Sequence, residues 1–338
     1  MNNQSARPHS SAHATPLAAA AAAVAPDATT RDFAQSLHRC LAEQPHQISP
    51  KFFYDAAGSA LFDQICDLPE YYPTRTEITL LERHAPAMAA QIGAGAELIE
   101  FGAGSLTKVR LLLQALLARN LAPARFLPVD ISAEHLQAQC LRLRGELPDL
   151  QVEPLIVDFT QPLPLPARGN ERRVGYFPGS SIGNFTPDEA LAFLTRSAGL
   201  LRGGGLLIGI DLVKDPALLH AAYNDAQGVT AAFNLNLLHR ARRELGCDIE
   251  PANFWHHALF NPTRGRIEMH LVSKQRQHIH LEGQRYELAA GETIHTENSY
   301  KYTVDGFQAL ARRAGFVPGT CWLDERRWFC VMWLDAPS

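Results

Sequence analysis

Two glycines lie where an apolar stretch meets an amphipathic one, and glycines at such a junction allow the backbone to approach a ligand closely. The stretch ELIEFGAGSLTK carries Gly102 and Gly104 at this junction. Because glycine has no Cβ, such a turn lets the backbone lie against a ligand, and the helix that follows offers free N–H groups. The same turn is also compatible with a tight strand-to-helix connection that binds nothing.

Acidic residues follow the next two apolar runs. FLPVD ends in Asp130, and LIVDF ends in Asp158 and Phe159. In a doubly wound sheet, an acid after the second strand can accept hydrogen bonds from both hydroxyls of a ribose. An acid after the third strand can accept from an adenine amino group, and the phenylalanine ring can stack on the base. Lys108 either reaches the carboxylate of the ligand or is a solvated lysine on a helix face.

These residue types favour S-adenosylmethionine as the ligand. The turn lacks the third glycine of G-x-G-x-x-G, which makes NAD and an oxidoreductase activity doubtful. It also lacks the GK[ST] sequence, so a P-loop is excluded. Strand ends that carry G-x-G, then Asp, then Asp-Phe, fit S-adenosylmethionine better.

Alternating strands and helices must position these residues. Short apolar runs alternate with helical patterns, which predicts an α/β fold with a parallel, doubly wound sheet. The expected strands are 98–101, 126–129, 155–157, 174–177 and 206–212, and the helices between them are 106–118, 133–143 and 187–200. Beyond them we expect a mostly helical stretch at 216–245. Three strands of a meander follow at 266–273, 278–281 and 286–288, and the chain ends in a helix and two strands.

The change of pattern after residue 212 predicts two structural units. The α/β unit comprises residues 76–212 and 302–338. A second unit comprises residues 31–75 and 213–301. Residues 1–30 are rich in alanine, and we expect them to form a disordered tail.

The composition excludes several classes of protein. The chain of 338 residues is 46% hydrophobic with a net charge of −4, as in soluble globular proteins, and no Lys/Arg run suggests a nucleic-acid partner. No segment resembles a membrane span, so we expect a cytoplasmic protein. Six scattered cysteines without CxxC spacing predict free thiols, and we expect no metal site. No exposed apolar stripe is evident, which favours a monomer.

Seven stretches, in a fixed order, carry a resemblance to a known family. They are KFFYDAAGSALFDQICDLPEYYPTRTE, EFGAGSLTK, PGSSIGNFTP, DLVKD, AYNDAQGVTAAFN, RIEM and TENSYKY. Together they resemble the L-histidine N-alpha-methyltransferase family, which begins ergothioneine biosynthesis. The resemblance implies a class I methyltransferase domain (Rossmann-like) with a second substrate-binding domain, and S-adenosylmethionine as cofactor. It also implies three methylations of the α-amine of L-histidine, through the mono- and dimethyl forms, to give hercynine.

The resemblance assigns residues to both ligands. The implied cofactor contacts are Tyr71, Gly102, Lys108, Asp130, Asp158 and Phe159. The implied substrate contacts are Tyr54, Asn184, Tyr223, Met269, Glu297 and Ser299. Tyr54 is expected near the amine and is the candidate catalytic residue.

The chemistry of the substrate residues suits histidine. Asn184 and Tyr223 resemble the pair that holds the substrate carboxylate. Glu297 and Ser299 stand two apart, so in an extended segment they point to one face. The carboxylate can accept from one imidazole N–H while the serine serves the other nitrogen, and Met269 packs against the ring. Without the resemblance, these residues read as turn, packing and exposed strand positions.

Two other functions remain open. One is the same methyl transfer to another amino acid such as tryptophan. Glu297 and Met269 argue against it, since an indole has a single N–H and needs more room. The other is a non-catalytic sensor on this fold, which would bind its ligands without releasing S-adenosylhomocysteine.

Overall fold

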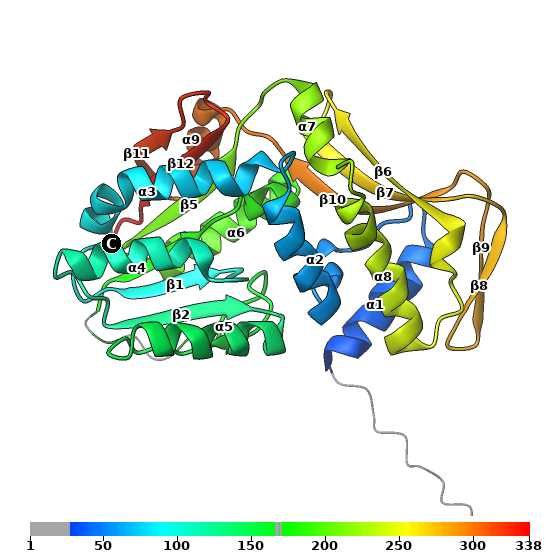
Figure 1. Cartoon of the computed structure of the whole chain (residues 1–338), viewed down its shortest axis with the longest axis horizontal. Helices are drawn as coiled ribbons and strands as arrows, with labels where there is room; N and C mark the ends of the chain where they lie inside the picture. The colour runs from blue at the N-terminus through cyan, green and yellow to red at the C-terminus, as the bar shows by residue number, and fades with distance from the viewer. Residues whose placement is uncertain (1–27, 166–168, 170) are drawn as a thin grey trace, which may run out of the picture.

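The computed structural model describes residues 28–165, 169 and 171–338, which fold into two parts that lie side by side (Figure 1). The first helix, α1, runs over Ala28–Ala42. The predicted tail is therefore wrong for residues 28–30, which belong to this helix. The rest of that prediction, residues 1–27, lies outside the described residues.

A seven-stranded sheet forms the core of the first part, in the order β11-β12-β5-β4-β1-β2-β3. Its strands are β1 (Glu97–Phe101), β2 (Arg125–Asp130), β3 (Leu155–Ile156), β4 (Arg173–Phe177), β5 (Gly205–Asp211), β11 (Val317–Leu323) and β12 (Phe329–Asp335). β1 to β5 are parallel, and β12 pairs antiparallel with β5. The predicted doubly wound α/β sheet is confirmed, although β3 is shorter than expected.

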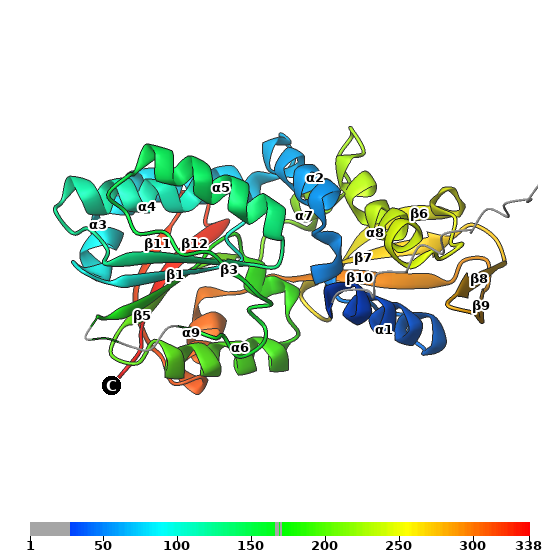
Figure 2. The same cartoon turned by 90° about the horizontal axis from the view of Figure 1, so that it is seen from below.

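Helices cover both faces of this sheet, as Figure 2 shows. One face carries α3 (Tyr72–Ile92), α4 (Thr107–Ala118) and α5 (Ala133–Glu146), and the other carries α6 (Pro187–Leu200) and α9 (Val304–Arg313). Every residue of β1, β4 and β5 is buried, which explains why most of their residues are apolar, although Glu97, Glu100, Arg173 and Asp211 are buried there too. α3 begins at Tyr72, and Pro73 suits the first turn of a helix.

The second part combines helices with antiparallel strands. Its helices are α1, η1 (Pro50–Phe53), α2 (Ala56–Asp67), α7 (Pro216–Tyr223), α8 (Val229–Leu245) and η3 (Pro251–Asn253). Its strands are β6 (Phe254–Asn261), β7 (Arg266–Ser273), β8 (Gln277–Leu281), β9 (Gln284–Leu288) and β10 (Thr293–Tyr300). They form a sheet in the order β10-β7-β6 and a separate β8-β9 ladder. The sequence pattern assigned neither β6 nor β10 as a strand, and the expected single meander is divided between these two sheets.

One hydrophobic core draws on two segments that are distant in sequence. It contains Phe33 and Tyr72 from the N-terminal segment, and Leu219 and Ile294 from the long insertion after β5. The insertion therefore buries apolar side chains against the N-terminal helices as well as against itself. The boundaries of the two domains stay a prediction.

A close backbone approach holds the two parts together where β10 leaves the second part. Gly183 lies in η2 (Ser181–Asn184), which follows β4. A Cβ at this position would lie 2.8 Å from the carbonyl oxygen of Tyr300 in β10. Glycine is required here because any side chain would push β10 away from η2, and with it the residues that both elements carry.

Replacing Gly183 with alanine is expected to destabilise the protein by about 1 to 3 kcal/mol, because the new methyl group overpacks a backbone contact. Urea unfolding measures this change. Gly199→Ala in α6 is the matched control, because no atom lies within 4 Å of its added Cβ, and its stability should be unchanged or slightly raised. Equal stability of the two variants would contradict the assigned contact.

Candidate active site

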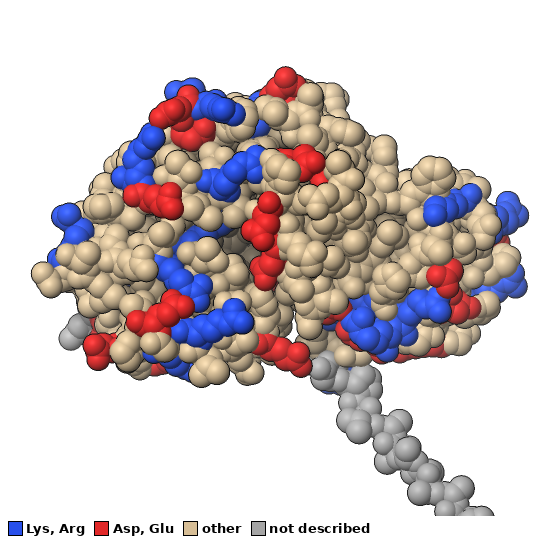
Figure 3. All heavy atoms as spheres, in the orientation of Figure 1, with Lys and Arg blue, Asp and Glu red and all other residues tan. Residues whose placement is uncertain are grey.

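A pocket at the junction of the two parts brings together side chains from both. Its lining residues are Tyr54, Phe62, Tyr71, Pro73, Gly179, Ser180, Ser181, Asn184, Asp211, Tyr223, Glu297, Ser299 and Lys301. Five of the six predicted substrate residues are among them. The sixth, Met269, is buried in β7 directly opposite Glu297 in the β7–β10 pairing. On the face shown in Figure 3, basic and acidic side chains are interspersed and the surface is hollowed where the two parts meet.

A local irregularity in β10 aims Glu297 at this pocket. The pairing of β10 with β7 shifts its register between His295 and Glu297, as in a β-bulge. The hydroxyl of Thr296, at the bulge, donates to the backbone oxygen of Met269 at 3.1 Å. Glu297 and Ser299 then line the pocket together, so the predicted common face is confirmed. Burial raises the pKa of Glu297 to about 7, against the opposing charge of Lys301.

Lys301, which the sequence analysis did not single out, connects three pocket residues. Its side chain is 1% exposed. The ammonium lies 2.8 Å from Oδ2 of Asp211 and donates to Ser299 Oγ at 2.7 Å and Tyr223 Oη at 3.2 Å. Tyr223 in turn donates to Ser299 Oγ at 2.7 Å. The pocket therefore contains a polar network, fully paired at the lysine.

Asp211, at the end of β5, is the anion of this network. A second lysine, Lys214, lies 2.5 Å from its Oδ1 atom, and the phenol of Tyr72 donates to both carboxylate oxygens at 2.9 and 2.7 Å. Burial alone would raise the pKa of Asp211, but Lys301 and Lys214 hold it below its ordinary value. The only sequence signal was that DLVKD and TENSYKY, which contain the acid and both lysines, were among the stretches of resemblance.

Aromatic rings form another wall of the pocket. Tyr54 follows η1, and its ring centroid lies 5.7 Å from that of Phe62 and 5.8 Å from that of Phe233. The Tyr71 ring lies 6.3 Å from the ring of Tyr223. Burial, with a further contribution from Glu297, raises the pKa of the Tyr54 phenol well above its ordinary value. Tyr54 is therefore a neutral phenol at physiological pH.

Asn184 reaches the same pocket from the sheet. It is the last residue of η2, immediately beyond the carboxyl end of β4. In doubly wound folds this edge carries the ligand crevice. The close approach at Gly183 sets Asn184 beside β10, which carries Glu297 and Ser299.

The glycine turn has the geometry that the sequence predicted for close approach. Gly102 and Gly104 have positive φ values of 66° and 51°. A Cβ at Gly102 would lie 3.3 Å from the ring of Phe159, whereas one at Gly104 would meet no atom within 4 Å. Oδ2 of Asp130 accepts from the Gly104 N–H at 3.1 Å. The predicted cofactor residues that follow β1, β2 and β3 therefore lie together at one edge of the sheet.

Two predicted cofactor residues already have protein partners. Oδ2 of Asp158 accepts from Lys51 Nζ at 3.0 Å, and Oδ1 accepts from the backbone and hydroxyl of Thr160. Lys108 lies 2.6 Å from the fully buried Glu77. Lys108 is thus not a solvated helix-face lysine, and its contact with a ligand stays a prediction.

The cofactor and substrate sets meet at Gly179. A Cβ on this residue would lie 3.3 Å from the Lys108 ammonium, and its N–H donates to Glu77 Oε2 at 2.8 Å. Gly179 also lines the pocket that contains the predicted substrate residues. Helix α4, which begins after the glycine turn, therefore presents its lysine to the edge of that pocket.

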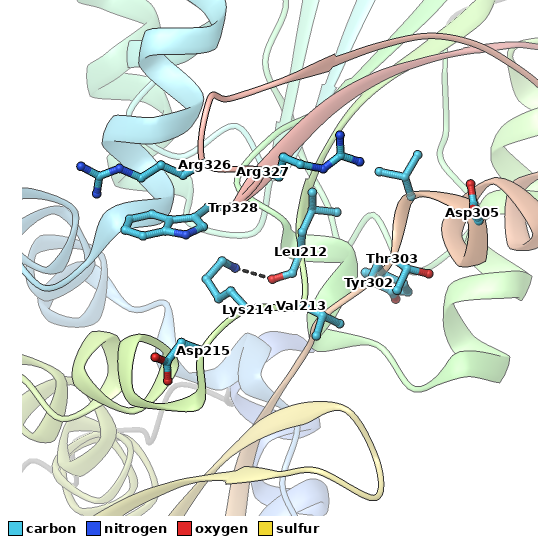
Figure 4. Close-up of a pocket in the computed structure, with 11 residues that line it drawn as sticks. Leu212, Val213, Lys214, Asp215, Tyr302, Thr303, Asp305, Arg326, Arg327 and Trp328 are labelled. Atoms are coloured by element: carbon cyan, nitrogen blue, oxygen red, sulfur yellow. Dashed lines mark hydrogen bonds between the residues drawn. The ribbon is translucent and has the colours of Figure 1, made fainter.

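A larger cavity, of about 540 Å³, lies beside the Lys214 side of the network (Figure 4). None of the predicted site residues lines it. Lys214 at its edge points back to the carbonyl of Leu212, and Arg326 and Arg327 stand at the far side. The smaller pocket is the better candidate for catalysis, because the buried polar groups converge there.

Other kinds of site find no support in the described ranges. They contain no group of three or more His, Cys, Asp or Glu side chains that could hold a metal ion. The six cysteines are all free thiols. Among the described helices, none combines the length and apolar character needed to cross a membrane.

Comparison with known proteins identifies the family. Residues 33–336 match the model of a family described as histidine-specific, SAM-dependent methyltransferases. A histidine N-alpha-methyltransferase of Mycolicibacterium smegmatis is 39% identical over 305 residues, 89% of this chain and 94% of that protein. One from Mycobacterium tuberculosis is 40% identical over 288 residues, 84% of this chain and 89% of that protein. Among solved structures, the CcbJ methyltransferase of Streptomyces caelestis aligns with a TM-score of 0.45 at 14% identity, covering 76% of this chain and 90% of that one. The chain belongs to the family of histidine-specific methyltransferases that depend on S-adenosylmethionine.

Proposed function

We propose that this protein methylates the α-amine of L-histidine three times, through the mono- and dimethyl forms, and releases hercynine for ergothioneine synthesis. The observation that carries the proposal is the pocket in which Glu297 and Ser299 stand together with Asn184 and Tyr223. The names of the two mycobacterial relatives support the same reaction.

The polar groups of the pocket suit the two ends of histidine. Glu297 accepts from one imidazole N–H, and Ser299 pairs with the other ring nitrogen. Asn184 donates to the substrate carboxylate, and Tyr223, whose hydroxyl hydrogen goes to Ser299, lines the pocket with it. Met269, behind Glu297, supports the ring from the core of the second part. The α-amine then lies toward Tyr54 and the cofactor.

The glycine turn fits the proposed cofactor. The open space beside Gly104 and the left-handed backbone at Gly102 leave room for a ligand that a side chain would fill. Asp130 keeps lone pairs for ribose hydroxyls beyond its bonds to Gly104 and Ser132. Tyr71, Lys108, Asp158 and Phe159 complete the proposed cofactor contacts. S-adenosylmethionine supplies an electrophilic methyl group on a sulfonium.

Positioning supplies most of the rate in this proposal. The α-amine of histidine must lose a proton before each transfer, because α-amino groups titrate near pH 8. The chain then holds the neutral amine in line with the methyl group, which avoids most of the entropy cost of the encounter. Tyr54 is a neutral phenol, so it orients the amine through its oxygen and ring rather than acting as a phenolate base.

Tyr54→Phe is expected to lower the methylation rate by about 10-fold or more, with a smaller loss of histidine affinity. The lost hydroxyl orients the amine only, whereas the contacts to the ring and carboxylate remain. Single-turnover kinetics measure the rate, and calorimetry measures histidine binding. Phe62→Leu is the control, because it alters the packing of the aromatic wall but leaves the Tyr54 hydroxyl in place. Equal losses of rate and affinity in Tyr54→Phe would reject this role.

Mass spectrometry of the product tests the function directly. With S-adenosylmethionine and histidine we expect three added methyl groups and three S-adenosylhomocysteine molecules for each histidine. The mono- and dimethyl forms should also be substrates, and tryptophan should not. Methylation of tryptophan alone would favour the alternative amino-acid substrate, and binding without S-adenosylhomocysteine would show a sensor.

We also propose that the enzyme is a cytoplasmic monomer. Light scattering of the purified full-length chain tests the monomer, and a dimer mass would reject it. Fractionation of the source cells tests the compartment.

A further inference from the structure

The groups around the Ser299 hydroxyl determine whether it donates or accepts a hydrogen bond in the pocket. A hydroxyl has one hydrogen to donate and two lone pairs that accept. Tyr223 donates to Ser299 Oγ at 2.7 Å, and Lys301 donates to the same oxygen at 2.7 Å. Both lone pairs are therefore occupied. The hydrogen of Ser299 is left to donate to a ligand in the pocket.

Lys301 cannot easily turn away from this arrangement. An ammonium has three N–H bonds, and those of Lys301 go to Asp211 at 2.8 Å, Ser299 at 2.7 Å and Tyr223 at 3.2 Å. Asp211 is itself held by Lys214 and by the phenol of Tyr72. Since both charges are buried, breaking the pair would leave an uncompensated ion.

Glu297 provides the complementary group two residues earlier on the same strand. The titratable groups around it are the phenols of Tyr54, Tyr71 and Tyr223 and the ammonium of Lys301. Asp211 lines the same pocket but is neutralised by its two lysines. The positive charge of Lys301 therefore favours the ionised, purely accepting form of Glu297.

We propose that Lys301, anchored by Asp211, is a positioning residue that sets the hydrogen-bond polarity of the substrate-ring subsite, with Ser299 as donor and Glu297 as acceptor. The subsite then selects a neutral five-membered azole with one N–H and one bare ring nitrogen, in a single tautomer. This inference rests on the proposed function, because it concerns how that pocket recognises its substrate.

The subsite distinguishes substrates by the donors and acceptors on the ring rather than by the size of the ring. Imidazole satisfies both groups. A pyrrole ring of the same size offers its N–H to Glu297 but places a C–H against the Ser299 hydroxyl, which is then buried without a partner. Without Lys301, Ser299 can turn its hydrogen toward Tyr223 and leave a lone pair facing the ring. The free-energy cost of binding pyrrole, which came from the unpaired Ser299 hydrogen, is then smaller.

The test compares histidine with its two pyrrole analogues, β-(pyrrol-2-yl)alanine and β-(pyrrol-3-yl)alanine, as substrates of the full-length enzyme. The analogue that places its N–H toward Glu297 is the better wild-type substrate of the two, and it is the one used. In Lys301→Met the ratio of the two kcat/KM values, histidine over the pyrrole analogue, is expected to fall by about 10-fold, the value of one hydrogen bond. Lys274→Met is the matched control, because it removes an exposed lysine that pairs with Ala252 and Trp255, outside this network. Its ratio should stay that of the wild type.

A pH profile provides a second readout that a purely structural role would not move. Binding of hercynine is measured by calorimetry, because its trimethylated nitrogen does not titrate. In Lys301→Met the loss of affinity on acidification should begin at a higher pH, by about one unit, since Glu297 has lost a nearby positive charge. Lys274→Met should keep the wild-type profile.

The outcomes separate this inference from the proposed function. A wild-type enzyme that does not methylate histidine would reject the function. A wild-type enzyme that does so, with an unchanged substrate ratio and pH profile in Lys301→Met, would overturn the role of Lys301 alone. If Lys301→Met does not fold, Ser299→Ala takes its place. It should lower kcat/KM for histidine by about 10-fold without lowering that for the pyrrole analogue, and equal losses for both would likewise overturn the proposal.

Discussion

Asp211→Asn is expected to destabilise the protein by about 3 to 5 kcal/mol, as for other buried ion pairs that lose one partner. The substitution keeps the size of the side chain but removes its charge. Lys301 and Lys214, whose side chains are 1% and 3% exposed, then remain as buried cations without a counter-charge. Urea unfolding at neutral pH measures the loss.

The pH dependence of this variant follows from the same charges. Without Asp211, burial depresses the pKa of both lysines below the value they have in the unfolded chain. The unfolded state then binds more protons, so the stability of the variant should rise with increasing pH relative to the wild type. Asp215→Asn is the control, because Asp215 is exposed and caps α7, and asparagine caps a helix equally well. If Asp211→Asn were as stable as the wild type, the two lysines would have to be solvated.

Glu297→Leu is expected to lower kcat/KM for histidine by about 10- to 100-fold. Leucine has a similar size but offers no acceptor, so the imidazole N–H becomes buried and unpaired, at a cost of about 1 to 3 kcal/mol. Glu297→Gln is the matched variant, because its amide oxygen still accepts a hydrogen bond. Steady-state kinetics should therefore place its loss between those of the wild type and Glu297→Leu.

The pH dependence of hercynine binding distinguishes charge from hydrogen bonding at this position. The pKa of Glu297 is raised to about 7, so the carboxyl becomes protonated as the pH falls through neutrality. Affinity of the wild type should then decrease on acidification, because the protonated acid no longer accepts freely. Glu297→Gln lacks this titration and should retain only that of the ligand's imidazole. Identical profiles for the two proteins would place the imidazole elsewhere in the pocket.

The strands of the central sheet could be predicted closely because their signals are local. A buried parallel strand is a continuous apolar run, and the turn after β1 needs glycine whatever lies elsewhere in the chain. For the same reason, Asp130 and Asp158 could be assigned to strand ends. β6 was missed because FWHHALFN shows no clear alternation, and its residues 255–257 are only partly buried or exposed.

The network around Lys301 could not be predicted, because its members are distant in sequence. Asp211 ends a strand of one part, Tyr223 ends a helix of the other, and Lys301 follows the last strand of the insertion. Each alone reads as an ordinary polar residue. The close contact at Gly183 and the register shift before Glu297 bring their elements together, and neither has a signature in the local pattern.

The sequence by itself determined the alternation of strands and helices, the glycine turn and the family to which the chain belongs, since these depend on local periodicity and on short stretches of residues. Only the tertiary structure decided that Lys108 pairs with Glu77, that Lys51 pairs with Asp158, and that a buried lysine stands behind Ser299. Pairing of buried charges depends on which side chains lose water together. That is a property of the packed molecule, which no stretch of the chain contains alone.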